Sequence, residues 1–294
     1  MNKTKYTLHY RNLRFYLEHG LVLGTVHRVI QFQQAPWLKP YIELNQHLRI
    51  DSKNDFDKEY FKLMNNAIYG KTCENQKKRT DIKLVLDDAK RKALTEKPHC
   101  LGFRIFKENL AAVEMRKIQC LINKPFYVGF SVLELSKLHM ARFHYEHMMR
   151  KYQEKASLLF TDTDSLMYEV ETANIYDDFK AISARDMFDF TGYPQTSKYY
   201  STQNNKVIGK MKDETAGEPI LEFVGLRPKM YSYVTVSMVN GALVEKDKHR
   251  AKGIQFASSK KLHHADFLAQ LHAPHENYLK NRRIGSKLHQ VDIN

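Results

Sequence analysis

The stretch LLFTDTDSLMYEV, residues 158–170, decides how the fold of this chain is interpreted. Two apolar runs flank a short polar segment, in which Asp162 and Asp164 stand two residues apart. Apolar runs around a polar tip of this kind predict a β-hairpin. Because strand side chains alternate, we expect both carboxylates to point to the same side of a two-residue turn. The pair either makes hydrogen bonds within the turn or holds a cation such as Mg²⁺.

The composition is that of a globular protein, and its charge is strongly basic. The chain has 294 residues, of which 43% are hydrophobic and 27% are charged. Its 47 Lys and Arg residues against 33 Asp and Glu residues give a net charge of +14. Such an excess favours a polyanionic partner, because cations near phosphates release condensed counterions. The alternative is a basic surface without a nucleic-acid partner.

Cysteine spacing and hydropathy point to an intracellular chain. Cys73, Cys100 and Cys120 lie far apart and lack metal-ligand spacing, so we expect reduced thiols. The N-terminus has no apolar signal region, and no run approaches the roughly 18 apolar residues that a membrane helix needs. We therefore expect no membrane partner, and the sequence leaves nucleus and cytoplasm open.

The hydrophobic pattern predicts an α+β fold. Two helices joined by a short polar turn, residues 37–49 and 55–69, predict an antiparallel helical hairpin that Gly70 ends. The other expected elements are a helix over 4–19, a strand over 21–34, a strand over 81–87 with a charged surface segment to 97, strands and loops over 103–117 and 125–130, a helix over 131–152, strands within 205–235, and short helical pieces in the basic tail from 246.

The second helix of this hairpin carries a row of polar side chains. Lys58, Lys62 and Asn66 fall at i, i+4 and i+8 on one face, and Tyr69 and Gly70 follow. Two ammonium groups and an amide in a row can hold a triphosphate, with the aromatic ring beside a sugar or base. The alternative is a solvated basic face that a glycine caps.

A third cluster lies in LRPKMYSY, where Lys229 and Tyr231 are two residues apart. On a strand the two side chains share a face, and a cation beside a phenol suits contacts with phosphate and sugar. The alternative is an edge strand with ordinary polar residues on its outer face.

Taken in order, these clusters resemble the motifs of family B DNA polymerases. KLMNNAIYGKT at 62–72 resembles motif B (K-x3-N-S-x-Y-G), FTDTDS at 160–165 resembles motif C (Y-x-D-T-D-S), and KMY at 229–231 resembles the K-x-Y motif. The flanking text, including HYRNLRFYLEHGLVLGTVHRVIQFQQAPWLKPYIELN and NRRIGSKLH, resembles the protein-primed branch, which serves adenoviruses, linear plasmids and Polinton (Maverick) transposons.

The resemblance implies an activity and roles for the metal and nucleotide residues. A DNA-directed DNA polymerase transfers nucleotides by an in-line displacement with two Mg²⁺ ions. Asp164 would bind the ions directly and Asp162 would support it. Lys62 and Asn66 would contact the triphosphate of the incoming deoxynucleotide, and Lys58 would assist them.

The remaining roles concern primer–template DNA. Tyr69 would pack against the nascent base pair, and Gly70 would let the template strand approach. Lys229 and Tyr231 would hold the primer terminus. Ser136 and Lys137, on the helix before motif C, would also contact primer DNA. The branch further implies a terminal protein as a primer.

The resemblance also implies subdomains. Residues 37–75 would be the helical-hairpin fingers, 1–36 and 76–240 the palm with its antiparallel sheet and packed helices, and 241–294 the start of a thumb. Ala67 and Phe160 replace the Ser of motif B and the Tyr of motif C. No stretch before Lys62 fits motif A, which supplies another metal-binding Asp, and the carboxylates of the proofreading exonuclease are missing. These gaps predict a fragment with very weak polymerase activity or none.

Two other functions stay open. The chain can be a non-catalytic nucleic-acid-binding remnant of a viral or transposon polymerase that keeps the basic groove without the chemistry. It can also be a metal-dependent nuclease built on the Asp pair, although no His or Glu cluster accompanies the turn. A motif A encoded just upstream would favour the polymerase, and a stop codon there would favour the non-catalytic remnant.

Overall fold

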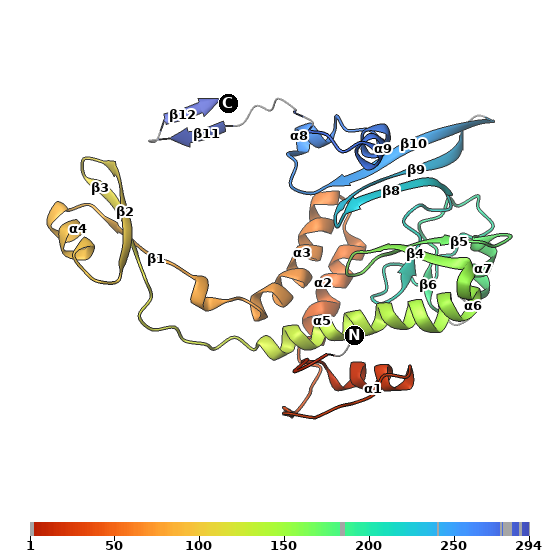
Figure 1. Ribbon diagram of the computed structural model, residues 1–294, viewed down its shortest axis with the longest axis horizontal. Helices are drawn as coiled ribbons and strands as arrows, with labels where there is room; N and C mark the ends of the chain where they lie inside the picture. The colour runs from red at the N-terminus through yellow and green to blue at the C-terminus, as the bar shows by residue number, and fades with distance from the viewer. Residues whose placement is uncertain are drawn as a thin grey trace. The chain divides into compact units, whose positions relative to one another are not determined.

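The computed structural model describes residues 3–182, 186–239, 241–276 and 278, together with the strands 284–287 and 290–293. It is a mixed α+β structure, with small sheets that are mostly antiparallel (Figure 1). The expected α+β class is therefore confirmed. The chain divides into two compact units: residues 1–30 with 133–281, and residues 31–132 with 282–294.

The first unit contains the hairpin around Asp162. Its described elements are α1 (Tyr10–Glu18), α5 (Phe126–Arg142, from residue 133 on), the π-helical segment η2 (Phe143–Met149), α6 (Arg150–Tyr152), η3 (Gln153–Lys155), β4 (Ala156–Thr161), β5 (Leu166–Val170), α7 (Ile175–Ile182), β6 (Phe188–Asp189), β7 (Met211–Lys212), β8 (Ile220–Arg227), β9 (Met230–Val239), β10 (Ala242–Ala251), α8 (Phe256–Ser259) and α9 (His264–His272).

An aromatic core supports this hairpin. Strand β5 packs against the core through Leu166, Tyr168 and Val170. The buried members of the core are Phe143, Met148, Tyr152, Ala156, Phe188, Phe190 and Tyr193. Burial of aromatic rings provides much of the stability of a unit of this size. The position of the turn after β4 is thus fixed by the packing of the strand that follows it.

The three-stranded sheet β8–β9–β10 is the second feature of this unit. Its strands are antiparallel in the order β10–β9–β8. Helix α9 is joined to it by a polar cluster around the buried Ser232 and His264, in which Ser232 Oγ lies 2.9 Å from His264 Nδ1 and 3.2 Å from Asp247 Oδ1. Buried polar groups need such partners, and these bonds fix the helix on the sheet.

The second unit contains the expected helical hairpin, α2 (Lys39–Asp51) and α3 (Asp55–Thr72). Its other described elements are η1 (Gln76–Lys78), β1 (Asp81–Val85), α4 (Asp88–Thr95), β2 (Cys100–Lys107), β3 (Leu110–Met115), the first residues of α5, β11 (Ile284–Lys287) and β12 (Gln290–Ile293). A small core of Val85, Val113 and Met115 lies between the sheet β1–β3–β2 and α4.

The strand expected over 21–34 is wrong. Residues 21–36 form neither helix nor strand, and Val22, Val29 and Ile30 are 94%, 77% and 73% exposed. A β-branched segment becomes a strand only when a neighbouring strand accepts its backbone hydrogen bonds. No described segment pairs with this one.

Several boundaries also differ from expectation. Helix α3 continues through Gly70 to Thr72, because the carbonyl of Tyr69 still receives the N–H of Cys73. Residues 125–130, expected as strand and loop, begin helix α5 at Phe126. The helix expected over 4–19 starts only at Tyr10, where the His9 side chain caps it. The charged segment after residue 87 is the short helix α4, which Asp87 caps.

Candidate functional site

The turn at Asp162 is a tight two-residue loop, as expected. The N–H of Asp162 donates to the carbonyl of Ser165 at 3.0 Å, and the N–H of Ser165 donates back at 3.3 Å. Between them, Thr163 has φ 60° and so adopts the left-handed conformation. That conformation costs a residue with a side chain roughly 1–2 kcal/mol, and Gly is usual there. A β-branched residue in it marks a strained position of the kind found at functional sites.

The KMY segment also lies at a hairpin turn. Strand β8 ends at Arg227 and β9 begins at Met230, opposite it in the register, so Pro228 and Lys229 form the loop. Lys229 has φ 61°. Proline at the first loop position with a positive φ at the second is the pattern of a type II turn. Because Lys229 lies in this loop, the direction of its side chain does not follow the alternation of strand β9.

These two turns contact each other. Lys229 Nζ lies 2.6 and 2.5 Å from the two carboxylate oxygens of Asp162. Just behind this ion pair, the Phe160 ring stacks on Tyr231, with ring centroids 4.6 Å apart. Phe160 also stacks on Phe223 of β8 at 5.7 Å. The structure thus brings together residues of two sequence motifs that are far apart along the chain.

Two geometric expectations are wrong at this point. Asp164 and Lys229 both lie within loops, so the strand alternation that would pair them with Asp162 and Tyr231 does not apply. Asp162 is half-buried and its carboxylate is bound by Lys229. Asp164 is exposed; its backbone N–H donates to the carbonyl of Asp162 at 2.6 Å, but its side chain makes no hydrogen bond or ion pair with any residue that the structure describes. The two carboxylates therefore have different environments.

The carboxylates of this turn do not by themselves make up a site for two Mg²⁺ ions. Mg²⁺ prefers oxygen ligands in an octahedral arrangement, and a pair of ions needs carboxylates from more than one segment. Here both oxygens of Asp162 already contact an ammonium group. Among the described residues, no group of three or more His, Cys, Asp and Glu side chains could hold a metal ion. Of the two carboxylates in this described turn, that of Asp164 is the one whose oxygens have no protein partner.

The row on α3 forms an exposed ridge in the second unit. Lys58 Nζ lies 3.1 Å from Asp55 and Lys62 Nζ lies 3.5 Å from Glu59, each one turn earlier. Exposed pairs of this kind contribute at most about 1 kcal/mol, so both ammonium groups remain available to an anion. Asn66 and Tyr69 follow on the same helix and are exposed.

Gly70 is exposed within this helix and has open space around it. A Cβ added there would meet no atom within 4 Å. Nothing in the packing of the described residues requires glycine at this position, although glycine inside a helix is destabilising.

Ser136 and Lys137 lie on α5 in the first unit. Lys137 Nζ donates to Glu134 Oε1 at 2.9 Å, and this hydrogen bond raises the pKa of the lysine. The buried Glu134 carboxylate also accepts a hydrogen bond from Asn12 of α1 at 3.0 Å. Lys137 is therefore part of the contact that holds α1 on α5. Ser136 is half-buried.

Two cations near the KMY turn were not predicted individually. In the β9–β10 register, Arg250 lies opposite Tyr231 and Lys248 lies opposite Tyr233, so these side chains share a face of the sheet. The alternation of cations in KDKHRAK, residues 246–252, is the sequence signal that could have identified them. It predicts a strand with one basic face, which the description of this segment as a basic tail does not include.

No family model, curated protein or solved structure matches the chain. None of the described helices combines the length and the apolar character that a bilayer crossing demands.

Proposed function

We propose that this chain is part of a DNA-directed DNA polymerase of family B, of the protein-primed branch. The observation that carries the proposal is the contact between the two motif turns. The DTD turn and the KMY turn are separated by 67 residues, yet Lys229 binds Asp162 and Phe160 stacks on Tyr231. Motifs that act on one primer terminus are expected to meet in this way, because catalytic groups must be held in a fixed mutual geometry.

In this proposal α3 binds the incoming deoxynucleoside triphosphate. Lys58 and Lys62 neutralise charge on the triphosphate, Asn66 donates to a phosphate oxygen, and Tyr69 packs on the nascent base pair. Gly70 leaves room for the template strand. The helical hairpin 37–75 is then the fingers subdomain.

The first unit positions the primer. Tyr231 and Lys229 lie beside the DTD turn. In this proposal the cations of β10 continue the same surface along the backbone of the primer–template duplex. The primer 3′ hydroxyl attacks the α-phosphate, and pyrophosphate leaves. Segments 1–36 and 76–240 are assigned to the palm and 241–294 to the start of a thumb, although the compact units group residues 76–132 with the helical hairpin.

A non-catalytic nucleic-acid-binding role is the second candidate. It is favoured by the same ion pair, because Lys229 occupies both oxygens of Asp162 and the described residues supply no third carboxylate. The contacts to DNA are the same in both functions, and only the chemistry differs.

The test is primer extension on a primed template with Mg²⁺ and all four deoxynucleotides, together with a DNA-binding titration. We expect DNA binding that weakens steeply with salt, and little or no extension. Template-dependent extension that is lost in Asp164→Ala would support the polymerase and refute the expected inactivity. A chain that does not bind DNA at low salt would contradict both candidate functions.

A further inference from the structure

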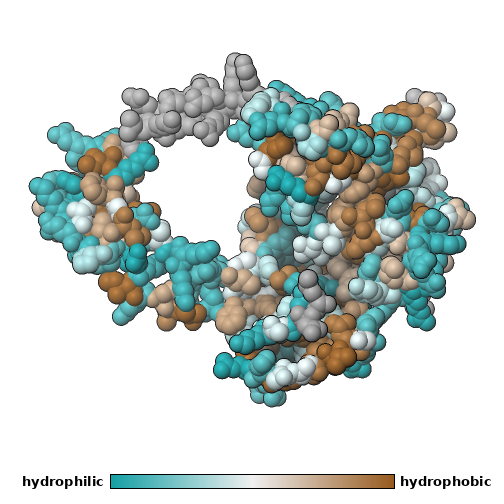
Figure 2. Space-filling model, in the orientation of Figure 1, coloured by the Kyte–Doolittle hydropathy of each residue, from teal (hydrophilic) through white to brown (hydrophobic). Residues whose placement is uncertain are grey.

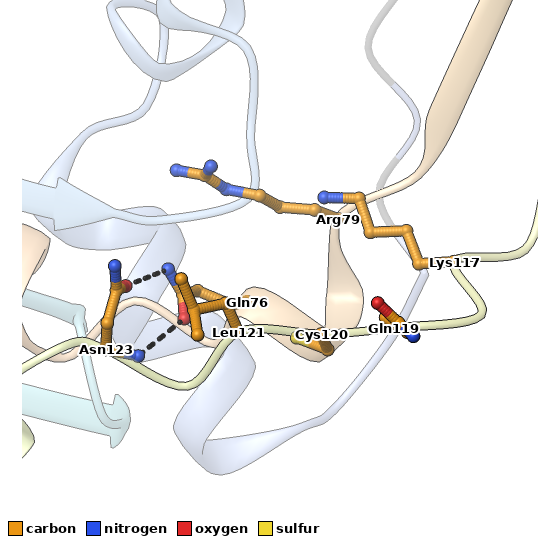
Figure 3. Close-up of a pocket in the computed structure, with 7 residues that line it drawn as sticks. All are labelled: Gln76, Arg79, Lys117, Gln119, Cys120, Leu121 and Asn123. Carbon is orange, nitrogen blue, oxygen red and sulfur yellow. Dashed lines mark hydrogen bonds between the residues drawn. The ribbon is translucent and has the colours of Figure 1, made fainter.

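The second unit contains a pocket that none of the polymerase motifs includes. It lies where residues 73–80, which include η1, and residues 116–125 run between the helical hairpin and the sheet β1–β3–β2. The pocket has a volume of about 290 Å³, and its polar lining includes Gln76, Arg79, Lys117, Gln119 and Asn123 (Figure 3). Cations and amides are the groups that bind phosphate.

A two-point contact holds the walls of the pocket together. Gln76 Nε2 donates to Asn123 Oδ1 at 2.9 Å, and the N–H of Asn123 donates to Gln76 Oε1 at 3.4 Å. Figure 3 shows both bonds at one end of the pocket, with the Arg79 and Lys117 side chains on the same side of it. The two segments are therefore fixed with their cations facing one opening.

The two cations differ in what they already bind. Arg79 Nε donates to Glu74 Oε1 at 2.6 Å, and hydrogen bonds from Lys71 and then Arg79 lower the pKa of Glu74 to about 2. Lys117 has no hydrogen bond or ion pair with any residue in the described part of the chain, and neither does the Gln119 side chain. The pocket thus has a cation and an amide that are unpaired within the described residues.

The charge around the pocket is predominantly positive. Residues 71–80 and 116–124 include seven basic side chains against the single acid Glu74. Figure 2 shows hydrophilic and hydrophobic residues side by side in this part of the surface, and Ile118, Leu121 and Ile122 of the second segment are exposed. The uncompensated charge of two adjacent segments attracts a polyanion, since neutralising it releases counterions from the polyanion.

We propose that this pocket binds a backbone phosphate of nucleic acid, as a contact separate from the α3 ridge and the DTD and KMY turns. Lys117 and Arg79 bind the phosphate oxygens, and Gln119 adds an amide donor. The proposal rests on the proposed function for the identity of the polyanion.

The test compares the salt dependence of DNA binding in single-charge variants. Fluorescence anisotropy with a labelled primer–template duplex is measured for the full chain, for Lys117→Gln and for Lys90→Gln. Lys90 is exposed on α4 of the same unit and outside the pocket, so its substitution makes the same change in net charge. We expect the slope of log K against log salt to fall in magnitude by about 0.9 in Lys117→Gln and to stay unchanged in Lys90→Gln.

Adding Arg79→Gln to Lys117→Gln is expected to lower the slope by about 1.8 in total. In a second experiment, the melting temperature of the DNA-free chain is measured with and without inorganic phosphate, for the unsubstituted chain and for Lys117→Gln. Equal slopes in the Lys117 and Lys90 variants would overturn the proposal. If phosphate alone raises the melting temperature, if Lys117→Gln removes this effect and if the slope for DNA does not change, the pocket binds free phosphate instead of DNA. If the unsubstituted chain does not bind DNA, the proposed function itself fails.

Discussion

Gly70→Ala is expected to make the chain more stable and its DNA binding weaker. Gly70 lies inside α3, and an added Cβ would meet no atom within 4 Å. Alanine in a helix interior is favoured over glycine by about 0.5–1 kcal/mol, so the free energy of unfolding should rise by this amount. If the template strand passes close to this backbone, the same methyl group collides with it, and the affinity for primer–template should fall about tenfold or more, equivalent to about 1.4 kcal/mol.

Urea denaturation and fluorescence anisotropy measure the two effects on the same variant. Gly102→Ala on β2 is the matched control, because a Cβ there also meets no atom within 4 Å and the residue belongs to the same unit. We expect no loss of DNA affinity in the control. A Gly70→Ala chain that binds DNA with unchanged affinity would show that the template does not approach this helix.

The contact between the two turns should give a large coupling free energy. In a double-mutant cycle of Asp162→Ala and Lys229→Ala, we expect the two changes in unfolding free energy to be non-additive by about 1–3 kcal/mol. The ammonium contacts both carboxylate oxygens, and about one third of each side chain is exposed. The cycle is measured by urea denaturation of the four proteins.

The exposed pair Asp55 and Lys58 on α3 provides the comparison. The Asp55 side chain is 96% exposed, so water screens this pair and its coupling should be about 0.5 kcal/mol or less. Equal coupling in the two cycles would mean that the DTD and KMY turns are not held together by Lys229.

The hairpin and the helices could be predicted because their signals are local. The apolar runs on both sides of Asp162, and the polar break between residues 51 and 55, suffice to predict β4–β5 and α2–α3, and both are confirmed. Helix periodicity and turn composition depend on neighbours a few residues away.

The errors arise where a distant partner decides the structure. Residues 21–34 have the composition of a strand but lack a pairing strand among the described residues. The interaction of Lys229 with Asp162 joins residues 67 positions apart, and the loop position of Lys229 depends on the register of β8 with β9. Neither the register nor the ion pair can be read from local pattern, since both depend on tertiary packing. The roles assigned to Asp164, Lys62 and Tyr69 remain predictions.

Template-directed selection of a nucleotide tests the polymerase proposal most directly, because it does not require the chemical step. The chain is bound to a labelled primer–template whose primer lacks its 3′ hydroxyl, and the dissociation rate of the DNA is measured with each deoxynucleotide in the presence of Mg²⁺. We predict that the nucleotide complementary to the template base slows dissociation about tenfold, equivalent to about 1.4 kcal/mol, and that Lys62→Ala removes this effect. Equal rates with all four nucleotides would contradict the proposal.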